Sequence, residues 1–114
     1  MPVIDDRSAD VRAFFQELER QRKHEFDISE RRIGITKESW YIQHTPRGDL
    51  LIGYMESQDF SRALQLFAQS QDSFDVWFKQ RLAGVTGGDL NNPPSGSLSE
   101  QLSSYEAAAP GPTA

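Results

Sequence analysis

Two strand-like segments joined by a compact turn constrain the fold of this chain more than any other feature. The segments Ile35–Thr45 and Leu50–Glu56 are rich in apolar and β-branched residues, and they flank the sequence Thr-Pro-Arg-Gly. Pro46 presets φ for a turn, and Gly48 can take the left-handed conformation of a three-residue hairpin loop. The sequence therefore predicts an antiparallel hairpin in which Thr45 pairs with Asp49.

Alternation along the two strands assigns the side chains to two faces of this hairpin. One face carries Trp40, Ile42, His44, Leu50, Ile52 and Tyr54, and the other carries Tyr41, Gln43, Thr45, Leu51, Gly53 and Met55. Helices of one small domain usually cover a single face, so the second apolar face needs a partner. A second copy of the chain is the most economical partner, and we expect a homodimer. A larger loop would exchange the pairing but leave both faces partly apolar.

Helical patterns lie on both sides of the hairpin. Ser8 is a suitable cap for a helix that begins at Ala9, bends near Ile28 and Ser29, and ends before Gly34. After the hairpin, Ser57 or Asp59 caps a helix, and a break at residues 70–73 precedes another helix. The expected buried stripes of these helices are Val11, Phe14, Phe15 and Leu18, then Phe60, Ala63, Leu64 and Phe67, then Phe74, Trp77, Phe78 and Leu82.

The two ends of the chain have weaker patterns. Residues 2–5 offer at most a short strand. Residues 89–106 are rich in Pro, Gly and Ser, but Leu98, Leu102 and Tyr105 recur at intervals that predict a docking tail, with an edge strand as one form of it. Residues 107–114 are expected to be flexible. We therefore expect one domain over residues 1–106.

Composition limits the classes of function. The chain has 114 residues and a net charge of −5, so it lacks the basic surface that nucleic-acid binding requires. It has no cysteine, which excludes disulfides and thiolate chemistry. No apolar run approaches the length of a membrane span, and the acidic start is unlike a signal peptide. We expect a cytoplasmic protein that binds neither nucleic acid nor membrane.

The order of weak strand, helix, strand, strand, helix and weak strand is the ferredoxin-like βαββαβ arrangement. The segments ESWYIQ, GDLLIGYMESQDFSRAL, FDVWFKQRL and TGGDLNNPP resemble a family of small uncharacterised bacterial proteins in the ferredoxin-like, or dimeric α/β-barrel, group. The resemblance covers residues 10–106, and MPVIDDR is short for the first strand of that family. It implies dimerisation and a small-molecule pocket, without selecting a reaction.

His44 is the first candidate for chemistry. It lies near a strand end on the same expected face as Trp40 and Tyr54, and imidazole exchanges protons near neutral pH. In this hypothesis His44 is an acid or base and Tyr54 donates a hydrogen bond, while Trp40, Phe67 and Trp77 line a ligand pocket. The alternative is a locally hydrogen-bonded His44 and an aromatic set that forms the core.

Other polar residues offer less specific signals. Glu38 and Glu56 near the hairpin ends are either a carboxylate pair or two solvated groups. Asp75 and Lys79 have the spacing of a surface ion pair on a helix. His24 lies in a polar stretch, and with only two histidines a dedicated metal site is not expected.

The leading hypothesis is a homodimer that binds, and as an enzyme would transform, a small apolar or aromatic molecule by proton transfer without a cofactor. The first alternative is a dimeric interaction module without catalytic activity, in which the aromatic residues are core and interface. A haem or metal site at His44 is the second alternative.

Overall fold

The computed structural model of the chain describes residues 1–92 and 100–108. The elements follow in the order α1 (Ser8–Arg20), α2 (Lys23–Ile33), β1 (Ile35–Thr45), β2 (Gly48–Ser57), α3 (Phe60–Gln69) and α4 (Ser73–Thr86). The expected α+β class is confirmed. Among the described residues, however, the sheet has two antiparallel strands, so the four-stranded βαββαβ arrangement is not confirmed.

The first residues lie along the outer edge of β2. The backbone N–H of Leu51 donates to the carbonyl of Met1 at 2.8 Å, and the N–H of Val3 donates to the carbonyl of Asp49 at 2.9 Å. Pro2 and Leu50 form an isolated antiparallel bridge. The expected N-terminal strand is thus reduced to one bridge.

The segment before the hairpin forms two helices, where the sequence predicted one with a bend at Ile28 and Ser29. The break lies earlier, at Gln21 and Arg22, whose backbone N–H groups both donate to the carbonyl of Glu17. The polar run from Glu19 to Glu25 marks this break because it interrupts the buried stripe of α1. As expected, α2 ends at Gly34, which has a φ of 91°.

Capping explains the bounds of the last two helices. Asp59 accepts a hydrogen bond from the N–H of Arg62, and Asp72 accepts one from the N–H of Phe74. Two acidic side chains therefore begin α3 and α4, as the helix dipole favours. Ser8 does not act as the expected cap, because α1 begins at Ser8 itself and its hydroxyl binds Asp49.

The hairpin register differs by one residue from the prediction. Thr45 pairs with Gly48 rather than Asp49, because the loop contains only Pro46 and Arg47. The Thr45 hydroxyl accepts the N–H of Arg47 at 3.2 Å, and Gly48 adopts a φ of 120°. The assignment of the β2 side chains to the two faces was therefore wrong. Leu51 and Gly53 share the face of Trp40, while Ile52 and Tyr54 share the face of Tyr41.

The contact between Trp40 and Gly53 accounts for this register. The two residues are directly paired across the strands. A β-carbon at Gly53 would lie 2.8 Å from Cζ3 of Trp40, which is closer than packed side chains allow. Only glycine at this position lets the indole lie flat over β2, and a shift by one residue would place Ile52 or Tyr54 beneath it.

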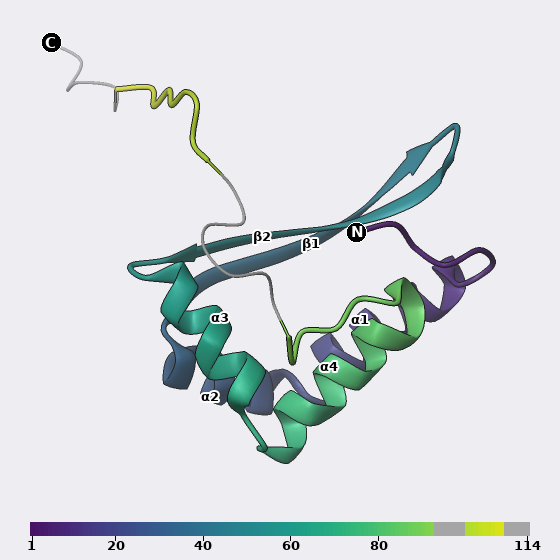
Figure 1. Cartoon of the computed structure of the whole chain (residues 1–114), viewed down its shortest axis with the longest axis horizontal. Helices are drawn as coiled ribbons and strands as arrows, with labels where there is room; N and C mark the ends of the chain where they lie inside the picture. Colours follow the sequence, from purple (N-terminus) through teal and green to yellow (C-terminus); the bar gives the residue numbers. More distant parts are fainter. Residues whose placement is uncertain (93–99, 109–114) are drawn as a thin grey trace, which may run out of the picture.

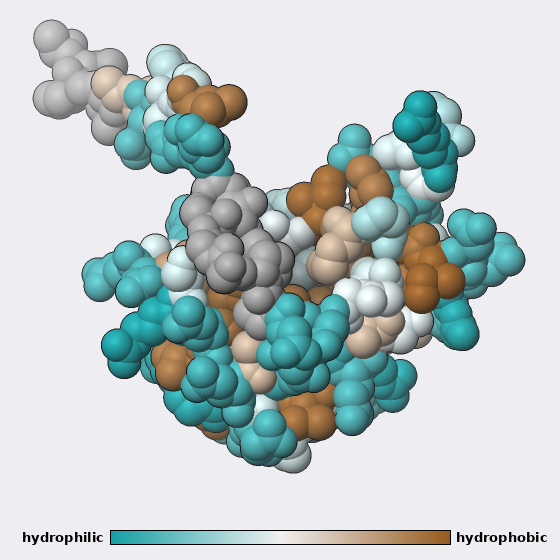
Figure 2. Space-filling view, viewed as in Figure 1, coloured by the Kyte–Doolittle hydropathy of each residue, from teal (hydrophilic) through white to brown (hydrophobic). Residues whose placement is uncertain are grey.

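All four helices gather on one side of the hairpin (Figure 1). Phe78 of α4 lies at the centre of the core, with its ring centroid 5.2 Å from Phe14, 5.7 Å from Phe67 and 6.1 Å from Trp40. The other sheet face leaves Tyr41, Ile52 and Tyr54 exposed. Figure 2 shows hydrophobic side chains along the hairpin that no helix covers.

The C-terminal tail differs from the prediction where it is described. Leu102 is 88% exposed and Tyr105 is 91% exposed, so neither docks on the body of the chain. Leu98 lies outside the described residues. Burial of the tail against a partner stays a prediction. Within residues 1–92 and 100–108, no helix has the length and apolar character needed to cross a membrane.

We predict that Gly53→Ala lowers the free energy of unfolding, by about 1–3 kcal/mol, because the added methyl group forces Trp40 out of its packed position. Urea unfolding measures this change. Gly84→Ala is the matched control: nothing lies within 4 Å of the new β-carbon, and alanine favours the helix, so stability should rise by about 0.5–1 kcal/mol. Equal effects of the two substitutions would contradict the role of Trp40 in the register.

Candidate functional site

A cavity of about 1080 Å³ lies between the hairpin, α2, α3 and α4. The inner face and outer edge of β2 form one wall, and the helices form the others. Apolar side chains supply most of the lining, among them Phe26, Ile33, Trp40, Leu51, Met55, Phe60, Leu64, Phe67, Phe74 and Phe78. The cavity exists beside β2 because Met1–Val3 cover only the first part of that strand edge, up to Leu51.

Two of the three expected ligand-binding residues line this cavity. Trp40 reaches it from β1 and Phe67 reaches it from α3. Trp77 is not among its lining residues, because its ring packs against Phe14 at 5.3 Å and is covered by the guanidinium of Arg22 at 4.3 Å. The aromatic set is thus divided between core and cavity.

His44 and Tyr54, the expected catalytic pair, are not brought together. They lie on opposite faces of the hairpin, and His44 is near its tip with a side chain that is 67% exposed. Nδ1 of His44 lies 2.6 Å from Oδ1 of Asp49, and the Ser8 hydroxyl donates to Oδ2 of Asp49 at 2.6 Å. Because Ser8 and His44 both bind the carboxylate and not each other, this is no catalytic triad. The three side chains instead link the hairpin tip to the start of α1.

Tyr54 lines the rim of the cavity, but its hydroxyl is engaged elsewhere. It donates to Oε2 of Glu56 at 2.8 Å, and this hydrogen bond raises the pKa of Tyr54. Glu56 therefore does not pair with Glu38, which lies on the opposite face of the hairpin. Of the two alternatives for these residues, the carboxylate pair is therefore not formed; Glu56 is exposed, as the solvated alternative expects, but Glu38 is half-buried.

Glu38 instead faces Glu30 of α2, and both carboxyl groups line the cavity. Burial, the charge of Glu38 and a hydrogen bond to Glu38 together raise the pKa of Glu30 to about 9. Burial also raises the pKa of Glu38, against the hydrogen bonds that it accepts from Trp40 and Glu30. Nε1 of Trp40 donates to Oε2 of Glu38 at 2.9 Å. At neutral pH, Glu30 is therefore protonated, and it donates a hydrogen bond to Glu38.

The spacing of the buried residues on α2 places Glu30 on the inward face of the helix. Phe26 and Ile33 are buried on α2, and Glu30 follows Phe26 by four residues, so it lies on the same face of the helix. One oxygen of Glu30, Oε2, is fully buried and contacts no N–H or hydroxyl donor among the described residues. The charged sequence around it resembled a solvated helix, which concealed this inward-facing carboxyl group.

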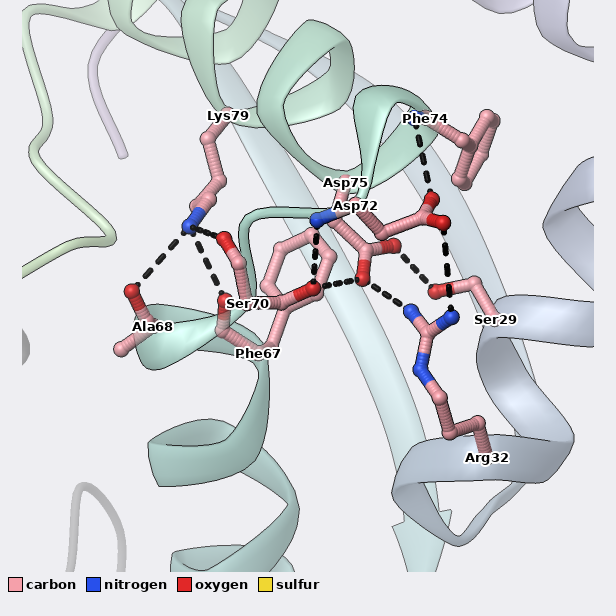
Figure 3. A network of polar contacts seen from close by, with 9 residues as sticks. All are labelled: Ser29, Arg32, Phe67, Ala68, Ser70, Asp72, Phe74, Asp75 and Lys79. Atoms are coloured by element: carbon pink, nitrogen blue, oxygen red, sulfur yellow. Dashed lines mark hydrogen bonds and ion pairs between the residues drawn. The ribbon is translucent and has the colours of Figure 1, made fainter.

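A second polar cluster joins α2, α3 and α4 (Figure 3). Asp75 and Lys79 were expected to form a surface pair, but they are 0% and 4% exposed and bind different groups. Asp75 accepts hydrogen bonds from Ser29 at 2.5 Å and Ser70 at 2.5 Å, and it pairs with Arg32. The ammonium of Lys79 donates to the carbonyls of Phe67, Ala68 and Ser70 at 3.0–3.1 Å.

This cluster is structural. The carbonyl groups at the end of a helix have no partners within the helix, and Lys79 supplies three donors to the end of α3. Burial lowers the pKa of Lys79, and the charge of Asp75 opposes that change. With the lysine donors and both Asp75 oxygens engaged, the cluster holds the helices that form the cavity walls in place.

Comparisons with known protein families, with curated proteins and with solved structures found no match. Across residues 1–92 and 100–108, no three His, Asp or Glu side chains gather where they would hold a metal ion.

We expect Lys79→Met to lower the free energy of unfolding by about 1–3 kcal/mol, because methionine fills similar space but leaves buried carbonyls without donors. Thermal and urea unfolding both report this change. Arg81→Met on the same helix is the control: its side chain is 56% exposed, so the effect should stay within about 0.5 kcal/mol. Similar losses for both variants would show that the Lys79 contacts do not stabilise the fold.

The Glu30 carboxyl group should make stability depend on pH. Its pKa is 4.5 in the unfolded chain and about 9 in the folded chain, so the folded state binds the extra proton between these values. The free energy of unfolding should therefore fall as pH rises through this window. Glu30→Gln, a neutral isostere, should flatten this slope and be the more stable form near pH 9. Urea unfolding midpoints measured across this pH window test the prediction, and Glu106→Gln is the exposed control. If the midpoints of Glu30→Gln and wild type changed with pH in parallel, the prediction would be contradicted.

Proposed function

We propose that the chain binds a small apolar or aromatic molecule in the cavity beside β2. The observation that carries this proposal is the cavity itself, whose volume of about 1080 Å³ and mainly apolar lining match those of small-molecule sites. A few polar groups among many apolar ones are typical of such sites, because the polar groups orient the ligand. Here the inward-facing polar groups are the carboxyls of Glu30 and Glu38.

We infer that any reaction at this site is proton transfer without a cofactor. Two carboxyl groups whose environments separate their pKa values can act as acid and base. For an uncharged ligand, Glu30, which keeps its proton, would serve as the acid, and Glu38, which accepts a hydrogen bond from Glu30, would serve as the base. His44 has no part in this proposal, because it does not line the cavity.

Binding can be tested with the neutral fluorescent probe N-phenyl-1-naphthylamine. Leu64 of α3 lines the cavity, so Leu64→Trp should reduce its volume and weaken binding by tenfold or more, about 1.4 kcal/mol. Leu66 lies on the same helix but does not line this cavity, so Leu66→Trp should bind like wild type. Absence of binding to wild type, or equal binding by both variants, would contradict the proposal.

We further propose that the chain is a homodimer of ferredoxin-like subunits. The bridge between Pro2 and Leu50 supports this, since a short antiparallel segment beside the second hairpin strand occupies the place of a first strand in βαββαβ topology. Dimerisation would cover the sheet face that carries Tyr41, Ile52 and Tyr54. The alternative of an interaction module without catalytic activity rests on this same exposed face.

Ile52→Glu should convert the dimer to monomer, because it places a charge in the centre of the apolar sheet face. Sedimentation at micromolar concentration should give about twice the chain mass of 12.9 kDa for wild type and the single mass for the variant. Leu66→Glu is a matched control, since Leu66 is 37% exposed and Ile52 is 39% exposed, and it should remain dimeric. A monomeric wild type would remove the dimer proposal.

A further inference from the structure

The charged side chains around the cavity are all of one sign, and the N-terminal ammonium of Met1, which also lines it, donates to the carbonyl of Leu51 at 3.0 Å. The described lining residues of the cavity include the acidic side chains Glu30, Glu38, Glu56 and Asp59, and none of them is lysine, arginine or histidine. The nearest basic groups of the helix walls are engaged elsewhere: Arg32 pairs with Asp72 and Asp75, and Lys79 binds carbonyls. Acidic side chains around a site favour cations over anions.

Aromatic rings form much of the remaining wall. The lining includes the partly exposed rings of Trp40, Phe60 and Phe67, with the buried rings of Phe26, Phe74 and Phe78 behind them. The face of an aromatic ring is electronegative and attracts an organic cation, and it also packs against an apolar body. Acidic groups and aromatic rings in one cavity therefore favour a ligand that is both apolar and positively charged.

The carboxyl pair offers a place for the charge. Glu30 faces Glu38 across the cavity wall, with Asp75 as the next acidic group, and the charge of Asp75 is already compensated by Arg32, Ser29 and Ser70. Trp40 supplies one donor to Glu38, and the shared proton supplies the other. A primary ammonium carries three donors, so it can bind both carboxylates once that proton has left.

We propose that the cavity takes an organic amine with an aromatic or aliphatic body, whose ammonium group binds at the carboxyl groups of Glu30 and Glu38 that line the cavity. The inference rests on the proposed binding function and names the class of ligand. The charge balances: the cationic ligand enters, the Glu30 carboxyl releases one proton to solvent, and no covalent bond of the ligand changes. Binding is thus an exchange of a proton for an ammonium ion.

Calorimetric titration of the full chain with three matched probes tests this proposal at about pH 7.5, below the pKa of Glu30. The probes are 1-naphthylmethylamine, 1-naphthylmethanol and 1-naphthoate, which share a ring system and differ in charge. We expect the amine to bind at least tenfold more tightly than the alcohol, and the carboxylate to bind most weakly. Titrations in phosphate and Tris, which differ in ionisation enthalpy, should show release of close to one proton with the amine and none with the alcohol.

Two variants locate the effect. Glu30→Gln and Glu38→Gln should each remove most of the preference for the amine over the alcohol, together with the proton release. Glu106→Gln, on the exposed tail, should behave like wild type. Equal affinity for amine and alcohol, amine binding without proton release, or an unchanged preference in both cavity variants would overturn the amine inference and leave the binding function standing. Failure of all three probes to bind would overturn both.

Discussion

The close contact between the indole of Trp40 and the backbone of Gly53 sets the register of the hairpin, and the rest of the structure depends on that register. It places Leu51 and Met55 on the face that the helices cover, and Ile52 on the open face. The indole also packs against the rings of Phe15 and Phe78, at 5.4 and 6.1 Å between centroids. One side chain therefore links the sheet to α1 and α4.

The same indole also fixes the position of the Glu38 carboxyl group in the cavity. Its N–H donates to Glu38 and so directs that carboxyl group inward, towards Glu30. Two carboxyl groups near each other in an apolar site cannot both ionise without a large electrostatic cost, and they share a proton instead. The helices keep Glu30 beside Glu38 because contacts of Asp75 and Lys79 join α4 to α2 and to the end of α3. The fold thus places acidic groups at a site where only a proton or another cation can balance them.

Local patterns predicted the hairpin and the last two helices, but not the division of the first helical segment into α1 and α2. The turn at Pro46 and Gly48, the cap at Asp59 and the stop at Gly34 are short-range features, and each is found in the structure. The register was not predictable from the turn sequence, because loops of two and three residues both suit it. What decided between them was the cross-strand fit of Trp40 over a glycine, a contact between residues far apart in the chain.

The candidate site was predicted only in part, for the same physical reason. Trp40 and Phe67 line the cavity as expected, since large aromatic residues at strand and helix spacing face inward. Tyr54 was assigned to the face of Trp40 and His44 through the wrong register, and His44 lies near the hairpin tip, away from the cavity. Glu30 was missed because a charged residue in a charged segment predicts solvent exposure, and only the meeting of α2 with β1 reverses that expectation.

The most direct test of this account is a carbon-detected NMR titration of the glutamate side-chain carboxyl groups. The account predicts that the carboxyl carbon of Glu30 titrates with a midpoint near pH 9. In Glu38→Gln the midpoint should fall towards the ordinary value but stay above it, because burial remains when the neighbouring charge is removed. A Glu30 midpoint between about 4 and 5 in the wild-type protein would contradict the shared proton, and with it the polar centre of the proposed site.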